Sequence, residues 1–474
     1  MHGDVRSSAP ATPEPRGPVP RGPVRRRRRG AGGGTLAFVE SPVQLLNVLE
    51  WAYRETAAER DPEPDGSDPE ADPVPESDSG SEPDLDSGAV PESRPGPDSG
   101  ACSLPEGLTV VVLSPHDPMT RGQLRRVAEF ARAEGVAVRW EDAREGTLAP
   151  VRTVTSLAPE LRRARRIVIG DPFSRYVQLL LTLSSARSVV VVDDGTATME
   201  FVHQLARGER LMRWHQGGTG GARAALFLLF SRRARDRLTP GARDGEHRVE
   251  VFSAMPVEAT TAELAALGVT VTANRFSWTR ARFGPPRLTR GTDLVGTSLV
   301  ETGVVDLERY LEAVAALART HGATRYFAHR RENGDKLHRV AAATGLEIVR
   351  PDLPLELVAR RGPVGRTILS FPSTVVHTLP LALAGTEVSV AVCEVRAGWL
   401  TESASPRAEG FLSGVSGSAR GVRRLPPPVP EPVPGPVPER AQEAAAGGEL
   451  RAPGETGEAR GGGVAASGTG AASA

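Results

Sequence analysis

A run of four valines after Ser188 constrains the fold of this chain more than any other feature. An apolar run of this length, without polar alternation, is typical of a strand that is buried on both faces of a parallel sheet. Asp193, Asp194 and Gly195 follow the run at once. Ligands of open α/β sheets bind beyond the carboxyl ends of the strands, so the two aspartates are candidates for base chemistry.

Strand-like and helix-like segments alternate on both sides of this run. The first series predicts strands at residues 35–39, 108–113, 136–140, 166–169 and 188–193, with a helix after each. A second series predicts strands at residues 293–298, 324–328, 346–350, 366–371 and 387–395. Regular alternation of this kind predicts the α/β class, with two Rossmann-like doubly wound domains in tandem. By analogy with the GT-B architecture of glycosyltransferases, which these domains resemble, we expect them to face each other across a cleft.

Composition marks the segments that we expect to lie outside these domains. The 51 glycines and 41 prolines, with only 39% hydrophobic residues, suit a mixture of folded and disordered segments. The predicted parts are a disordered tail over 1–34, an N-terminal domain over 35–290 with an acidic disordered insert over 56–106, a C-terminal domain over 291–400 and a disordered tail over 401–474. Within the first domain, the stretch 208–290 does not follow the alternation and is left without assigned elements.

The formal net charge of zero hides an uneven distribution of charge. Residues 61–100 carry 13 acidic residues and one arginine, which leaves the rest of the chain basic. A basic folded part suits an anionic ligand such as a nucleotide. A general preference for arginine explains the surplus equally well, because Lys336 is the only lysine in the chain.

The terminal and cysteine patterns predict a cytoplasmic protein. The arginine run at 25–29 has no apolar segment after it, so no signal peptide is expected. This run could touch acidic lipid at the inner face of a membrane, although a plain basic tail is the simpler interpretation. It lacks interleaved aromatic residues, and we expect no nucleic-acid partner. The apolar stretch 224–230 is too short to cross a bilayer, and Cys102 and Cys393 suggest no disulfide framework.

Three groups of polar residues follow predicted strands in the second series. His329 and Arg330 come after one strand, Glu356 lies in a short helix, and Ser373 and Thr374 open another helix. A helix start with free N–H groups and hydroxyls is suited to a phosphate. A carboxylate can bind ribose hydroxyls, and a histidine can balance the charge of a phosphate or protonate it.

These positions resemble the motifs of bacterial sialyltransferases and polysialyltransferases, which use CMP-sialic acid. In those families an acidic pair before a glycine supplies the general base, as Asp193, Asp194 and Gly195 would here. A histidine motif and a Ser-Ser/Thr motif contact the donor phosphate, and a glutamate between them binds the ribose. The matching residues are His329, Ser373, Thr374 and Glu356. The resemblance covers residues 35–400 without the acidic insert, and residues 41–44 resemble the first strand–helix turn of the polysialyltransferase branch.

The resemblance implies the GT-B architecture and an inverting glycosyltransferase. It would transfer sialic acid or a related nonulosonate from a CMP-activated donor to a glycan acceptor. Asp193 would take the proton from the acceptor hydroxyl, with Asp194 orienting it or, alternatively, acting as the base. His329, Ser373 and Thr374 would stabilise the departing CMP, and no metal or other cofactor is expected because such charge neutralisation can replace a metal.

One departure from the family concerns the residue after His329, which is Arg330 rather than proline. The change relaxes the loop and adds a cation, which could assist donor binding or mark a different donor. Two alternatives therefore stay open. The first is another nucleotide-activated transferase, such as a CDP-glycerol-type glycerophosphotransferase or an enzyme of another nucleotide sugar. The second is a non-catalytic α/β scaffold.

Simpler structural interpretations also exist for the single residues. The aspartate pair and the Ser373–Thr374 pair could be ordinary helix caps. We interpret Asp171 as a turn residue rather than as part of the acceptor site. We interpret Lys336 as a solvated helix residue. The role of Glu332, the acceptor, the linkage and the oligomeric state stay open.

Overall fold

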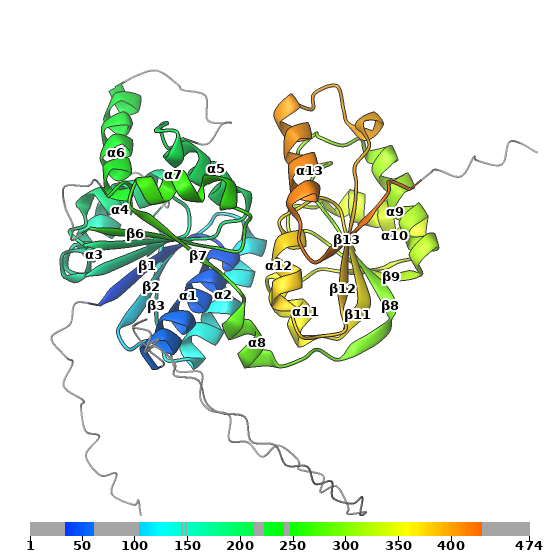
Figure 1. The fold of residues 1–474 in the computed structure, drawn as a ribbon, viewed down its shortest axis with the longest axis horizontal. Helices are drawn as coiled ribbons and strands as arrows, with labels where there is room; N and C mark the ends of the chain where they lie inside the picture. The colour runs from blue at the N-terminus through cyan, green and yellow to red at the C-terminus, as the bar shows by residue number, and fades with distance from the viewer. Residues whose placement is uncertain are drawn as a thin grey trace, which may run out of the picture. The chain divides into compact units, whose positions relative to one another are not determined.

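The computed structural model describes residues 34–60, 104–143, 146, 149–212, 222–240 and 247–428. They form two parallel sheets, and each sheet has helices on both faces (Figure 1). The predicted disordered tails and acidic insert lie largely outside the described residues. Within the described ranges, no helix combines the length and the apolar composition that crossing a membrane requires.

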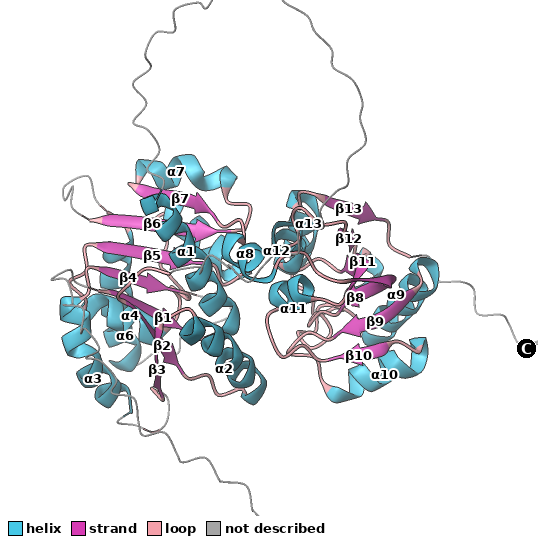
Figure 2. Ribbon diagram, turned by 90° about the horizontal axis from the view of Figure 1, so that it is seen from below, coloured by secondary structure: helices cyan, strands magenta, loops and turns pink. Residues whose placement is uncertain are grey.

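The first sheet has seven strands in the order β3-β2-β1-β4-β5-β6-β7 (Figure 2). Its strands are β1 (Thr35–Val39), β2 (Leu108–Leu113), β3 (Ala137–Glu141), β4 (Arg166–Ile169), β5 (Ser188–Val192), β6 (Arg248–Ser253) and β7 (Val269–Ala273). Its helices are α1 (Pro42–Arg60), α2 (Pro118–Ala133), α3 (Ala149–Arg163), α4 (Arg175–Leu183), α5 (Thr196–Ala206), α6 (Ala222–Leu238) and α7 (Thr261–Ala266), after which α8 (Ser277–Phe283) leads to the second sheet. All strand pairs are parallel, and the strand order reverses between β1 and β4.

The second sheet repeats this order with six strands, β10-β9-β8-β11-β12-β13. Its strands are β8 (Leu288–Val295), β9 (Ala323–Phe327), β10 (Glu347–Val349), β11 (Val364–Ser370), β12 (Ser389–Cys393) and β13 (Val422–Leu425). Its helices are α9 (Leu307–His321), α10 (Gly334–Thr344), α11 (Leu355–Arg361), α12 (Val375–Ala382) and α13 (Pro406–Ser418). Both sheets therefore have the doubly wound Rossmann order, each with one point at which the order reverses. This confirms the predicted fold class.

The valine run behaves as its apolar pattern predicts. β5 lies between β4 and β6, and its four valines are buried. Val189 and Val191 belong to the hydrophobic cluster on one face of the sheet, whereas Val190 and Val192 belong to the cluster on the other. A strand covered on both faces cannot carry polar residues until it ends, which is why the aspartates appear only at its carboxyl edge.

Two stretches depart from the sequence predictions. The unassigned stretch 208–290 contains β6 and β7, which extend the first sheet. The predicted disordered tail over 401–474 is wrong up to residue 428, because α13 and the edge strand β13 lie there. β13 has the sequence Val-Arg-Arg-Leu and only partly buried side chains, so it gives little apolar signal. α1 also continues to Arg60, into the predicted insert.

Candidate functional site

A cleft of about 1120 Å³ lies at the carboxyl edge of the first sheet. It is lined by the segments that follow β1, β2, β3, β4 and β5, and by two arginines from the loop after β9. Its charged lining residues are Glu40, Asp117, Asp171, Arg175, Asp194, Arg330 and Arg331. The cleft spans the β1–β4 reversal, which is where open α/β sheets bind ligands.

Asp193 lies beneath this cleft and does not line it. Its side chain is 2% exposed. The Ser253 hydroxyl donates to the Asp193 carboxylate at 2.5 Å, and the backbone N–H of Ala254 donates to its other oxygen. Burial raises the pKa of Asp193 to about 6, although these hydrogen bonds oppose the shift. The contacts tie the end of β5 to the end of β6.

Asp194 is the aspartate that lines the cleft. Ser41, in the loop between β1 and α1, donates its hydroxyl to the Asp194 carboxylate at 3.4 Å. The backbone N–H of Asp194 donates to the Thr198 hydroxyl at 2.9 Å, which fixes the turn into α5. Asp193 as the base stays a prediction, but the geometry favours Asp194 for contact with a ligand in the cleft.

Gly195 brings the acidic pair against the second domain. Its φ is 66°, and a Cβ at this position would lie 2.9 Å from Cγ2 of Thr374. A side chain here would therefore meet both backbone strain and a steric contact. The Asp-Asp-Gly segment and the Ser-Thr segment, predicted separately from the sequence, thus touch each other.

Ser373 and Thr374 precede α12 at the carboxyl end of β11. Thr374 occupies the cap position of α12, but its side chain makes no capping hydrogen bond. The Ser373 hydroxyl lies 3.4 Å from that of Ser370. Helix capping by the Thr374 hydroxyl, the simpler interpretation of this residue, is therefore not what the structure shows.

His329 follows β9 and is held as a neutral ring. The backbone N–H of Arg331 donates to its Nδ1 at 3.2 Å, so the proton of the neutral ring sits on Nε2. Burial, aided by the neighbouring cations Arg330, Arg331 and Lys336, lowers the pKa of His329 to about 4. His329 can therefore donate a hydrogen bond from Nε2 at neutral pH.

Arg330 connects the two domains electrostatically. Burial lowers the pKa of its guanidinium. The carboxylates of Asp194, Asp117 and Glu356 act in the opposite direction, so each lies close enough to attract it. Asp117 and Asp194 line the cleft from the first sheet, whereas Glu356 belongs to α11 of the second domain. The residue that departs from the family motif thus sits at the centre of the candidate site.

Glu356 is buried, with 5% of its surface exposed, so it is not a surface glutamate. The Thr378 hydroxyl, from α12, donates to its Oε1 at 2.6 Å. Burial raises the pKa of Glu356, and Arg330 opposes that shift. The carboxylate joins the start of α11 to α12 at the side of the site where Arg330 lies.

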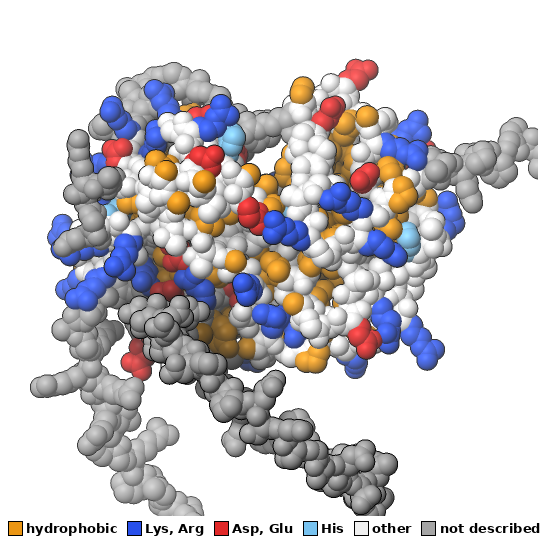
Figure 3. Space-filling model, in the orientation of Figure 1, with side chains coloured by type: hydrophobic (Ala, Val, Ile, Leu, Met, Phe, Trp, Pro, Cys, Tyr) orange, Lys and Arg blue, Asp and Glu red, His pale blue; other side chains and the backbone are white. Residues whose placement is uncertain are grey.

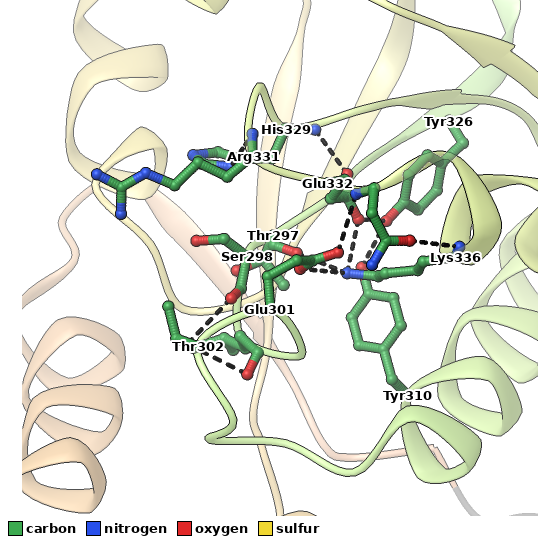
Figure 4. Close-up of polar contacts among 12 residues, drawn as sticks. Thr297, Ser298, Glu301, Thr302, Tyr310, Tyr326, His329, Arg331, Glu332 and Lys336 are labelled. Carbon is green, nitrogen blue, oxygen red and sulfur yellow. Dashed lines mark hydrogen bonds and ion pairs between the residues drawn. The ribbon is translucent and has the colours of Figure 1, made fainter. Parts of the chain in front are cut away.

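The sequence predictions for two further residues, Asp171 and Lys336, had different outcomes. Asp171 is a turn residue, as predicted, since its carboxylate accepts from the Phe173 N–H at 2.9 Å, and it also lines the cleft. The prediction that Lys336 is solvated is wrong, because it is 1% exposed and paired with the buried Glu332 at 2.7 Å (Figure 4). A carboxylate four residues earlier on the chain was the available signal for such a pair.

Several cleft residues were missed by sequence reasoning. They share a place directly after a strand or near the start of the next helix, and they include Glu40, Asp117, Thr120, Ser174 and Tyr176. The rule that singled out the aspartate pair, polar residues after a buried strand, would also have found Glu40. Nothing in the local sequence marks Tyr176, which reaches the cleft from α4.

The described surface carries charge of both signs. The face drawn in Figure 3 shows basic side chains over both domains, with acidic side chains among them. This distribution gives no basic stripe on that face. Among the described residues, no group of three or more His, Cys, Asp and Glu is placed to hold a metal ion. Independence from metals and cofactors stays a prediction.

No family model and no curated protein matches this chain. Solved structures similar to it include an α/β-galactoside α-2,3-sialyltransferase of Photobacterium phosphoreum, at 6% identity and a TM-score of 0.40, over 82% of this chain and 98% of that one. An E. coli heptosyltransferase has 10% identity and a TM-score of 0.36, over 82% and 92%. A UDP-bound protein of O. sativa has 14% identity and a TM-score of 0.36, over 67% and 86%. All three TM-scores are below 0.5, so the fold is assigned from the strand order of the two sheets.

Proposed function

We propose that this chain is an inverting, metal-independent glycosyltransferase that uses a CMP-activated sialic acid or related nonulosonate. One observation carries the proposal. Gly195 of the acidic motif meets Thr374 of the Ser-Thr motif, and Arg330 lies within electrostatic reach of both Asp194 and Glu356. Asp194 and Arg330 line the cleft, whereas His329, Glu356, Ser373 and Thr374 are not among its lining residues. A carboxylate and a cation thus face one cleft, with the Ser-Thr segment against Gly195 beside it, an arrangement that suits transfer from a nucleotide-activated donor.

In the proposed reaction Asp194 is the general base. Its carboxylate removes the proton of an acceptor hydroxyl while that oxygen attacks the anomeric carbon of the donor. The bond from this carbon to the phosphate oxygen breaks on the opposite face, so the configuration inverts and CMP leaves with the bonding electron pair. Asp193 is assigned a supporting role, since its carboxylate is occupied by Ser253 and Ala254.

The second domain would stabilise the departing CMP. Arg330 supplies a fixed positive charge, and His329 offers a hydrogen bond from Nε2. The Thr374 hydroxyl, which makes no capping hydrogen bond, would add a further donor, whereas the N–H groups of Val376 and His377 already donate to the Ser373 and Thr374 carbonyls. Together these side chains would neutralise the charge that develops on the phosphate, as a bound metal ion does in metal-dependent enzymes.

The sequence alternative of another nucleotide-activated donor has one observation in its favour. Arg330 stands where the motif of the sialyltransferases has proline, and a half-buried cation at this position suits any anionic leaving group. The comparison that separates the donors is calorimetric titration with CMP, CDP, UDP and GDP. The proposal expects CMP to bind at least tenfold more tightly than UDP and GDP. Preference for UDP or GDP would contradict a CMP-activated donor.

A further inference from the structure

A buried polar cluster lies under the candidate donor site and plays no part in the mechanism above. The Lys336 ammonium donates to the Thr297 carbonyl at 2.7 Å and lies 2.7 Å from Oε1 of Glu332 and 3.3 Å from Oε2 of Glu301. It also sits over the Tyr310 ring, 4.1 Å from the ring centre. Figure 4 shows these groups converging on the ammonium from separate segments.

Glu332 uses both carboxylate oxygens in this cluster. The Tyr326 hydroxyl donates to Oε1 at 2.6 Å, on the same side as Lys336. The backbone N–H of His329 donates to Oε2 at 2.6 Å. The carboxylate therefore holds the backbone of the residue that we place against the donor phosphate, and the Tyr326 hydroxyl is fixed in turn by that of Tyr310 at 2.6 Å.

The cluster joins two loops that follow adjacent strands. Thr297 and Glu301 belong to the loop after β8, and His329 and Glu332 to the loop after β9. β8 also pairs with β11, at the reversal of strand order, and the Ser373–Thr374 segment follows β11. Gly296 shows how closely the loops approach, because a Cβ there would lie 2.3 Å from Oε2 of Glu332.

Packing alone does not account for these charges. Lys336 and Glu332 are almost fully buried, and removing such charges from water costs several kcal/mol per ion. Apolar side chains of similar size in place of a buried ion pair are often neutral or stabilising. We therefore infer that the Glu332–Lys336 pair fixes the geometry of the loops rather than adding to the stability of the fold.

We propose that Glu332 and Lys336 are positioning residues that hold His329 and the loop after β8 in the geometry that the donor phosphate requires. The inference rests on the proposed function, and it adds residues that touch neither donor nor acceptor. Displacement of a catalytic group by about 1 Å costs on the order of 100-fold in rate.

The test is a variant that removes both charges at once, Glu332→Met with Lys336→Met. Because the two fully buried charges leave together, and the Glu301 carboxylate that remains keeps the backbone N–H of Asn333 as a donor, we expect it to fold with a free energy of unfolding close to that of the wild type. We expect kcat for CMP release to fall on the order of 100-fold, with the KM of the acceptor unchanged. If the double variant does not fold, Tyr326→Phe tests the positioning role instead, because it removes the hydroxyl that donates to Glu332.

A matched control is the exposed ion pair Glu308–Arg339, at 2.6 Å, whose arginine lies on the same helix as Lys336. Glu308→Gln with Arg339→Gln should leave kcat within about twofold, since exposed pairs contribute little. A folded double variant of Glu332 and Lys336 with kcat within tenfold of the wild type would overturn the proposal.

A readout without turnover separates this proposal from the proposed function. The imidazole of His329 is followed by nuclear magnetic resonance and assigned among the nine histidines with His329→Ala. In the double variant the chemical shift of the His329 imidazole should change, because its backbone loses the Glu332 carboxylate, whether or not any CMP sugar is turned over. An unchanged His329 signal would mean that the cluster does not position this residue, even if the wild type transfers sugar.

Discussion

The two domains share a strand order but differ in the chemistry of their carboxyl edges. The first edge presents carboxylates to the cleft, among them Glu40, Asp117 and Asp194. The second edge carries a neutral histidine, a half-buried arginine and two hydroxyls, at His329, Arg330, Ser373 and Thr374. The fold determines where a ligand meets the protein, and the loops after the strands determine what each side does with it. In the proposed reaction, proton removal and charge stabilisation therefore fall to different domains.

The largest effect is expected from removing the carboxylate that faces the cleft. Asp194→Asn should lower the rate of CMP release by on the order of 10²- to 10⁴-fold, the usual contribution of a general base. CMP binding, followed by calorimetry, should change little because the donor phosphate contacts the other edge. A larger loss in Asp193→Asn than in Asp194→Asn would restore the roles predicted from the sequence.

A smaller effect on binding is expected from the opposite edge. Arg330→Gln should weaken CMP binding by about 10- to 100-fold, because a charge-assisted contact contributes roughly 1.5–3 kcal/mol. Calorimetric titration with CMP measures this change. Arg339→Gln, an exposed arginine of α10, is the control and should bind CMP as the wild type does. Equal affinities for all three proteins would remove Arg330 from the donor site.

Asp193 gives a pH-dependent test of the buried edge. Its folded-state pKa of about 6 lies above the ordinary value of 3.8, so the native state binds the extra proton between these values. The free energy of unfolding should therefore fall as the pH rises from about 4 to about 6. Asp193→Asn can donate to Ser253 and accept from Ala254, as the protonated acid does, and should lose this dependence.

Denaturant titrations of wild type and Asp193→Asn at several pH values measure the effect. Above pH 6 the variant should be more stable by up to about 3 kcal/mol, at roughly 1.4 kcal/mol per unit of pKa shift. The difference should shrink as the pH falls toward 4. Parallel curves for the two proteins would show that the Asp193 pKa is not raised by burial.

The smallest effect concerns the contact between the two edges. Gly195→Ala should be less stable than Gly385→Ala by about 1 kcal/mol, since overpacking typically costs 1–3 kcal/mol. Both glycines have positive φ, at 66° and 77°, but only a Cβ at Gly195 meets another residue, Thr374. Adding Thr374→Ser, which removes Cγ2, should remove this difference in stability. A stability of Gly195→Ala that Thr374→Ser does not change would argue against the contact.

The sequence predicted the architecture through its apolar runs, but not the edges of the sheets. The buried valines of β5 carry a pattern that only a covered strand needs. The edge strand β13 has no such pattern, since its side chains are partly exposed and its arginines resemble those of a tail. β13 has a neighbouring strand on one side only and packs through Val422 and Leu425, so two apolar residues are all that its sequence shows.

The sequence indicated where the polar residues of the candidate site lie, but not which of them face the cleft. Polar residues after strands were found at Asp194, His329 and Ser373 because the carboxyl edge of a parallel sheet is where ligands bind. Which of two adjacent aspartates faces the cleft depends on Ser253 and Ala254, which are distant in sequence. Lys336 was misjudged because its burial depends on Glu301 and a backbone carbonyl that local sequence does not place nearby.

The proposed function requires that the carboxyl edges of both sheets act on one CMP-activated donor. Release of CMP from CMP-sialic acid, with a glycan acceptor present, tests it most directly in the wild type and in the double variant Asp194→Asn with Arg330→Gln. We expect the wild type to release CMP. We expect the rate in the double variant to be at least 10³-fold lower, because the variant loses both a base and a phosphate contact. Equal rates for the two proteins would contradict it.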